Sequence, residues 1–119
     1  MKKLIYILTL FILSACGNTT QKSEKPILTV TLEPLRYFTE AIAGDNYEVV
    51  SMVPKGSSPE SYDPTPQQLV NLSKSQAYFR IGYIGFEQAW MKKLEANCPN
   101  MKVYNTSKGI DLIRDDGHW

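Results

Sequence analysis

PKGSSPESYDPTP, residues 54–66, is the most informative segment of the chain. Its four prolines and one glycine exclude a strand or a helix, so we expect an ordered loop. An apolar stretch ends directly before this loop and a helix start follows it. Glu60 stands in its middle, between Pro59 and Tyr62. A loop that holds one carboxylate after an apolar strand is typical of α/β proteins, whose ligand sites lie at the carboxyl ends of parallel strands.

Short apolar strands alternate with amphipathic helices on both sides of this loop. Strands are predicted over residues 27–32, 47–53, 77–81 and 101–104. Helices are predicted from Pro34 to Gly44, from Thr65 to about Ser75, and from Phe86 to before Pro99. This alternation predicts an α/β fold with a four-stranded, mainly parallel sheet and flanking helices.

Two helices carry specific signals. In the first, Leu35, Phe38, Ala41 and Ile42 recur at helical spacing, as in an amphipathic helix on a face of the sheet. In the helix after the loop, Thr65 is a predicted cap, Pro66 suits the first position, and Gln68 completes a capping box.

The first residues form a predicted lipoprotein signal. Lys2 and Lys3 precede an apolar run, residues 4–13, which is shorter than the roughly 20 residues that a membrane-spanning helix needs. The run ends in Leu-Ser-Ala-Cys, a bacterial lipobox in which Cys16 accepts the lipid. An ordinary secretory signal with an incidental cysteine is the alternative interpretation.

This signal divides the chain and places it in the cell. We expect a signal peptide over residues 1–15, a lipidated polar tether over 16–26 and an α/β lobe over 27–113. The tether after Cys16 has no apolar residue to bury and should be flexible. The expected location is the bacterial cell envelope, on the periplasmic or extracytoplasmic side, with acylated Cys16 in the lipid bilayer.

Charge and cysteine content exclude two classes of function. The net charge is +1, and losing Lys2 and Lys3 with the signal removes two positive charges, so no basic surface for nucleic acid is expected. A thiol enzyme would need a base beside Cys98, and His118, the only histidine, lies near the end of the chain. We therefore predict that the protein is not an enzyme.

The loop resembles the Pro-His-x-Tyr-Glu-Pro-Thr-Pro loop of the metal-binding (zinc and manganese type) substrate-binding lipoproteins of ABC transporters, solute-binding protein family 9. Two further segments support the resemblance. Residues 82–87, Gly-Tyr-Ile-Gly-Phe-Glu, are similar to the family's Asn-Gly-x-Gly-x-Glu turn. Residues 105–110, Asn-Thr-Ser-Lys-Gly-Ile, also resemble a family segment, and the segments follow one another in the family's order. The resemblance implies two α/β lobes that bind metal between them. The chain is similar to the N-terminal lobe alone, and residues 114–119 resemble the start of the family's acidic, histidine-rich loop, which indicates a truncated chain.

The resemblance also implies site residues. Glu60 takes the place of the family's histidine ligand and is the expected metal ligand, with a solvated glutamate or a helix-end partner as the alternative. His118 is a second candidate ligand, although a terminal histidine of a metal-scavenging loop is the simpler interpretation. Tyr62 and Asp63 could hold the loop and its metal ligand in position. Alternatively, the role of both is structural: Tyr62 packs against other side chains and Asp63 makes a turn before Pro64.

The implied function is capture of a divalent transition metal, zinc (Zn²⁺) before manganese (Mn²⁺) or iron (Fe²⁺), for an ABC permease in the membrane. Carboxylate oxygen is a ligand for all three metals. The alternative is an envelope binding or adhesion lipoprotein of the same fold that lacks a high-affinity metal site.

Overall fold

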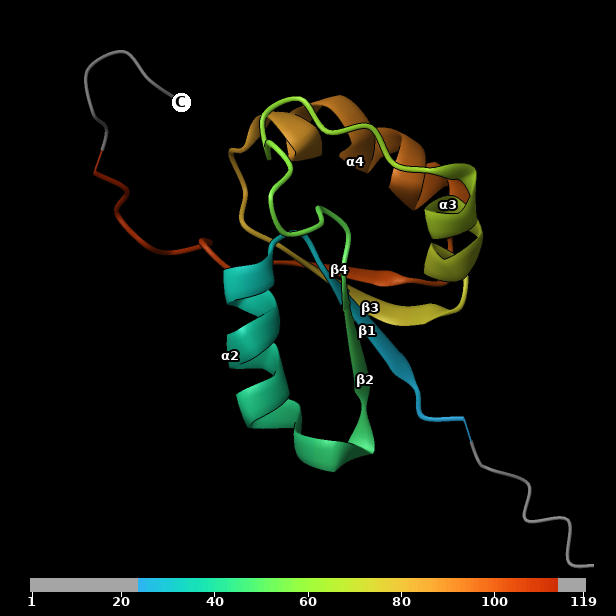
Figure 1. Cartoon of the computed structure of the whole chain (residues 1–119). Coiled ribbons are helices and arrows are strands. Elements are labelled where there is room, and N and C mark those ends of the chain that lie inside the picture. The colour runs from blue at the N-terminus through green and yellow to red at the C-terminus, as the bar shows by residue number, and fades with distance from the viewer. Residues whose placement is uncertain (1–23, 114–119) are drawn as a thin grey trace, which may run out of the picture.

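The computed structural model describes residues 24–113, which fold around one four-stranded sheet (Figure 1). The strand order is β2-β1-β3-β4, and all three neighbouring pairs are parallel. The predicted α/β fold with its parallel sheet is therefore confirmed. The elements in chain order are β1 (Ile27–Val30), α2 (Glu33–Ala43), the short 3-10 helix η2 (Gly44–Asn46), β2 (Glu48–Ser51), α3 (Pro66–Leu72), β3 (Ser75–Arg80), α4 (Gly85–Asn97) and β4 (Lys102–Asn105).

The predictions for Cys16 and His118 lie outside the described residues. Within those residues, no helix is long and apolar enough to cross a membrane.

The elements differ from their predicted bounds mainly at their ends. β2 ends at Ser51, two residues early, although Met52 and Val53 still donate backbone hydrogen bonds to the end of β1. α3 ends at Leu72, because the chain turns there and β3 already begins at Ser75. Ser75 is held at the start of the sheet by the hydroxyl of Thr29, which donates to Ser75 Oγ at 2.9 Å.

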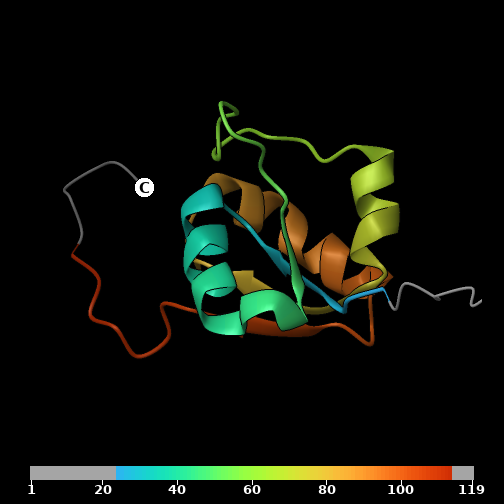
Figure 2. The same ribbon diagram turned by 60° about the horizontal axis from the view of Figure 1, so that its bottom comes forward.

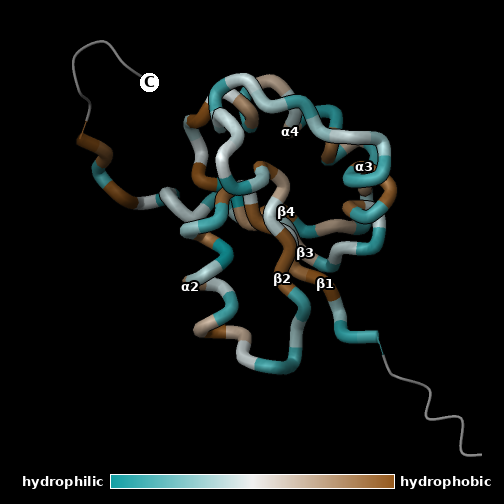
Figure 3. Tube along the Cα trace, in the orientation of Figure 1, coloured by the Kyte–Doolittle hydropathy of each residue, from teal (hydrophilic) through white to brown (hydrophobic). Residues whose placement is uncertain are grey.

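The helices cover the sheet unequally. α2 lies on one side of the sheet, and α3 and α4 lie on the other (Figures 1 and 2). Figure 3 shows hydrophobic residues along β1 and along the neighbouring edge strand β2. The buried core lies between the sheet and the α3–α4 layer, and it consists of Met52, Val53, Leu72, Tyr78, Phe86, Met91, Leu94, Cys98 and Met101.

The apolar stripe of the first helix is largely exposed among the described residues. α2 contains no buried residue: Phe38 is 60% exposed and Ile42 is 89% exposed. The apolar spacing is present, but within residues 24–113 no further element packs against that stripe to cover it.

The strand order creates a switch point between β1 and β3. From β1 the chain passes to α2 on one side of the sheet, and from β3 it passes to α4 on the other side. In parallel α/β sheets, ligands bind outside the carboxyl ends of the strands at such a point. Because all four strands are parallel, the segments that follow them meet at this one edge.

Candidate functional site

The proline loop crosses the carboxyl edge of the sheet. It leaves β2 through the buried residues Met52 and Val53 and reaches the start of α4 before turning into α3 (Figure 1). There, Phe86 donates its backbone N–H to the carbonyl of Pro59 at 2.9 Å. The loop is therefore attached to a helix that comes some 25 residues later in the sequence.

Glu60 is exposed, and its carboxylate caps α4. Glu60 Oε2 accepts a hydrogen bond of 3.0 Å from the backbone N–H of Gly85, the first residue of α4. Such N–H groups have no partner within their own helix, and the helix dipole favours negative charge beside them. One oxygen, Oε2, is thus used by α4, while Oε1 accepts no hydrogen bond from residues 24–113.

Gly85 allows this close approach because it lacks a side chain. A Cβ atom at Gly85 would collide with the carbonyl oxygen of Glu60 and would lie 2.7 Å from Glu60 Oε2. The sequence singled out this glycine only as part of a turn, and its contact with the loop could not be read from spacing.

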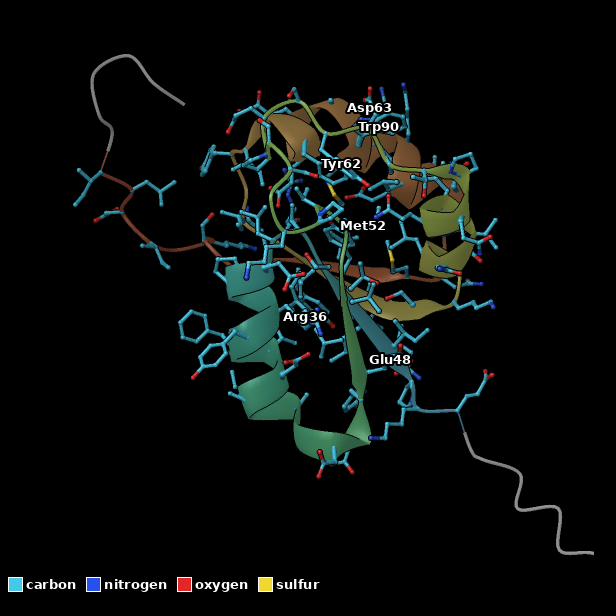
Figure 4. The ribbon with its side chains drawn as sticks, viewed as in Figure 1. Arg36, Glu48, Met52, Tyr62, Asp63 and Trp90 are labelled. Atoms are coloured by element: carbon cyan, nitrogen blue, oxygen red, sulfur yellow. The ribbon has the colours of Figure 1, made fainter. Side chains whose placement is uncertain are left out.

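Tyr62 and Asp63 attach the second half of the loop to α3 and α4. The Tyr62 hydroxyl donates to Gln68 Oε1 at 2.8 Å, and its ring lies 6.0 Å from that of Phe86. Asp63 Oδ1 accepts a 3.2 Å hydrogen bond from the indole N–H of Trp90 (Figure 4). Both side chains contact helices that flank the loop, and these contacts hold Glu60 over the carboxyl edge.

A second carboxylate, Glu87, lies buried beneath the same edge. Its side chain is fully buried, and Oε1 accepts hydrogen bonds of 2.6 Å from the Thr31 hydroxyl and from the N–H of Ile81. Oε2 accepts one of 2.6 Å from the N–H of Gly82 and lies 3.6 Å from Arg80 Nε. Glu87 therefore joins the end of β1 to the turn between β3 and α4.

The sequence did not predict this role for Glu87. It appeared there only as the last residue of a family-like turn, because helical periodicity does not show that a charged residue is buried. The network continues from Thr31 to the hydroxyl of Tyr78 at 2.8 Å. Burial raises the pKa of Tyr78 far above its usual value, so this hydroxyl keeps its proton and its hydrogen bond.

Cys98 belongs to the core and not to this site. It follows the last turn of α4 and is 6% exposed. Burial raises the pKa of its thiol, which disfavours the reactive thiolate.

Metal ligands are sparse in the part of the chain that the structure describes. Over residues 24–113, no group of three or more histidine, cysteine, aspartate or glutamate side chains is placed to hold a metal ion. Glu60 is the one predicted primary ligand among them, and Glu87 already accepts several hydrogen bonds.

Residues 28–119 match the family of the periplasmic component A of zinc-uptake complexes, ZnuA. The chain belongs to this family. The match includes the proline loop, the turn between β3 and α4, and β4. This match confirms the resemblance that the three sequence segments indicated.

Curated relatives resemble the chain over nearly its whole length. The iron ABC transporter substrate-binding lipoprotein MtsA of Streptococcus pyogenes is 36% identical over 92% of this chain. The manganese ABC transporter substrate-binding lipoprotein PsaA of Streptococcus pneumoniae is 33% identical over 98%. The chain spans only 38% of MtsA and 42% of PsaA.

Solved structures agree with this assignment. A crystal structure of ZnuA matches 77% of this chain with 41% identity and a TM-score of 0.71, over 36% of the ZnuA chain. A zinc-bound deletion mutant of ZnuA matches 79% with 41% identity and a TM-score of 0.73. The four-stranded sheet and its helices are therefore a ZnuA-type fold.

Proposed function

We propose that the protein is an extracytoplasmic substrate-binding lipoprotein that captures a divalent transition metal ion for an ABC importer. The observation that carries this proposal is the position of Glu60. An exposed carboxylate, one oxygen of which accepts no hydrogen bond from residues 24–113, lies over the carboxyl edge of a ZnuA-type sheet, next to its switch point. Relatives named as iron and manganese transporter lipoproteins support the same class of cargo.

Glu60 would contribute one metal ligand through Oε1. Zinc sites in proteins use about four ligands, so a single carboxylate does not hold the ion tightly. The remaining ligands would come from residues outside 24–113, among which His118 is a candidate. We propose zinc as the cargo, with manganese and iron as the alternatives, since carboxylate oxygen suits all three.

The N-terminal residues would supply the anchor. In this proposal residues 1–15 are removed, acylated Cys16 inserts its lipid into the bilayer, and residues 16–26 tether the lobe of residues 27–113. The protein would then work at the extracytoplasmic face, beside the permease that receives the ion.

Substitution of the proposed ligand tests the function. Glu60→Ala in the complete native protein should weaken zinc binding about tenfold or more, which is the range for losing a ligand or its support. Competition with a chromophoric chelator measures the affinity. Asp45→Ala is the matched control, because Asp45 is an exposed carboxylate in η2, before β2 and thus at the opposite edge of the sheet. An unchanged affinity in Glu60→Ala would exclude Glu60 as a ligand.

A second candidate function is an envelope binding or adhesion lipoprotein without a high-affinity metal site. The sparse metal ligands among residues 24–113 favour it. The two functions differ in a simple measurement on the complete protein. A thermal midpoint that rises with zinc and falls with chelator supports metal capture, whereas a midpoint indifferent to both supports the second candidate.

A further inference from the structure

Gly85 has an unusual place in the fold. It is the first residue of α4, and its backbone N–H donates to Glu60 Oε2 at 3.0 Å. Its backbone does not have a positive φ, so its conformation does not require glycine. The requirement is one of space, because a Cβ atom would collide with the Glu60 carbonyl and lie 3.0 Å from the Glu60 Cα.

The turn that precedes Gly85 is held in place by hydrogen bonds to a buried carboxylate. Glu87 accepts hydrogen bonds of 2.6 Å from the N–H groups of Ile81 and Gly82, where β3 ends. Glu87 is 1% exposed and also accepts a hydrogen bond from Thr31 after β1. The buried carboxylate therefore fixes the start of α4 relative to the sheet.

These contacts form one chain from the core to the exposed carboxylate. Glu87 fixes the turn, the turn fixes the N–H of Gly85, and that N–H fixes Oε2 of Glu60. Oε2 is engaged and Oε1 accepts no hydrogen bond within the described residues 24–113, so Oε1 is the oxygen that can face a ligand. Outer hydrogen bonds of this kind orient ligating carboxylates and contribute to metal affinity.

We propose that Gly85 is a positioning residue for metal capture: its N–H and its missing side chain hold Glu60 so that the carboxylate presents a single oxygen to the ion. This inference rests on the proposed function, in which Glu60 is a ligand. It assigns the role of orienting that ligand to the first turn of α4 and not to the proline loop alone.

The test compares Gly85→Ala, Glu60→Ala and the double variant in the complete native protein, with zinc affinity measured by chelator competition. Alanine is the better helix former, so without the collision Gly85→Ala would leave α4 intact or stabilise it. We expect Gly85→Ala to weaken zinc binding about tenfold. We expect no further loss when it is added to Glu60→Ala, because the two substitutions disable the same ligand.

Gln88→Ala is the matched control for the first turn of α4. Gln88 donates its side-chain amide to the carbonyl of Tyr83 at 3.0 Å and makes no hydrogen bond to Glu60. The control should keep the zinc affinity of the unsubstituted protein. A loss in Gln88→Ala equal to that in Gly85→Ala would overturn the proposal, because the turn would then respond to any change.

The remaining outcomes distinguish a failure of the positioning role of Gly85 from a failure of the proposed metal capture. If Glu60→Ala weakens binding and Gly85→Ala does not, the positioning role is wrong and the metal function stands. If Gly85→Ala weakens binding equally with and without Glu60, its effect is general and the positioning role is wrong. If Glu60→Ala has no effect, the ligand assignment fails and the positioning role fails with it.

Amide hydrogen exchange provides a readout that needs no substitution at Gly85. The first N–H of a helix has no acceptor within the helix, so protection of the Gly85 amide depends on Glu60. We expect slowed exchange at Gly85 in the unsubstituted protein and exchange near the rate of an unprotected amide in Glu60→Ala. Equal exchange in the two proteins would overturn the proposal.

Discussion

Two carboxylates at one edge of the sheet have opposite environments. Glu60 is exposed and keeps one oxygen without a hydrogen bond from residues 24–113, whereas Glu87 is 1% exposed and both of its oxygens accept hydrogen bonds. Burial of a carboxylate is costly unless it is paired or hydrogen-bonded. Glu87 meets that condition, so its function is to stabilise the fold, while Glu60 remains available to a ligand.

Removing the buried carboxylate should destabilise the protein strongly. Glu87→Ala leaves the N–H groups of Ile81 and Gly82 without their acceptor and Arg80 without its partner. We expect the free energy of unfolding to fall by about 3 kcal/mol or more. Urea denaturation measures the change, and Glu95→Ala on the exposed side of α4 is the control. Equal midpoints for the Glu87 and Glu95 variants would contradict this account.

The thiol of Cys98 should be inert in the folded protein. Burial raises its pKa, so at a given pH less thiolate forms than in an exposed cysteine. At pH 8 we expect iodoacetamide to modify Cys98 only after unfolding in urea, as measured by peptide mass mapping. Rapid alkylation of the native protein would show that Cys98 is accessible, against its position in the core.

At the scale of single elements, local signals in the sequence predicted the start of α3 correctly. Thr65 Oγ1 accepts the N–H of Gln68 at 3.2 Å, and Gln68 Oε1 accepts the N–H of Thr65 at 2.9 Å, which is the predicted capping box. Gln68 does more than a cap requires, because it also accepts the Tyr62 hydroxyl and donates to the carbonyl of Met52. One side chain thus connects both ends of the proline loop.

The side chain of Gln68 should therefore contribute more to the stability of the fold than that of its neighbour Gln67. Gln68→Ala removes the Gln68 side-chain half of the capping box and the bonds to both loop ends, and we expect the free energy of unfolding to fall by about 2 kcal/mol. Gln67→Ala is the matched control, since Gln67 lies on the exposed side of the same turn and its side chain bonds only Asn71 among residues 24–113. Thermal or urea denaturation gives the comparison. A control as destabilised as Gln68→Ala would mean that the loop contacts contribute little.

The sequence predicted what short-range patterns determine and missed what distant contacts determine. The alternation of strands and helices, the parallel sheet and the capping box follow from spacing and composition. The hydrogen bond between Asp63 and Trp90 joins residues 27 positions apart, and the contact of Glu60 with Gly85 joins residues 25 apart. Such pairs depend on how the loop lies over α4, which no local pattern indicates.

At the scale of the whole molecule, the two faces of the sheet are covered to different extents, with α3 and α4 over one face and α2 alone over the other. The buried core faces α3 and α4, while α2 exposes Tyr37, Phe38 and Ile42. Clustered exposed apolar residues of this kind indicate an interaction surface or a tendency to associate. The apolar spacing in the first helix is thus present, but residues 24–113 leave Phe38 and Ile42 exposed.

The exposed stripe predicts association of the isolated lobe. Residues 24–113 produced alone should form concentration-dependent oligomers, because burying Phe38 and Ile42 removes apolar surface from water. Replacing both with glutamate should shift the population to monomer, as measured by sedimentation velocity. The control replaces the exposed Glu95 and Gln88 with alanine, which should not change the distribution between monomer and oligomer. A lobe that is monomeric at all concentrations would contradict this interpretation.

The metal content of the complete native protein shows directly whether it captures a transition metal ion, as proposed above. The protein would be extracted from membranes, equilibrated with equal amounts of zinc, manganese and iron, separated from free metal and analysed by plasma mass spectrometry. We predict one bound transition metal ion per molecule, zinc before the other two, and its loss in Glu60→Ala. A protein that retains no transition metal from this mixture would contradict the claim.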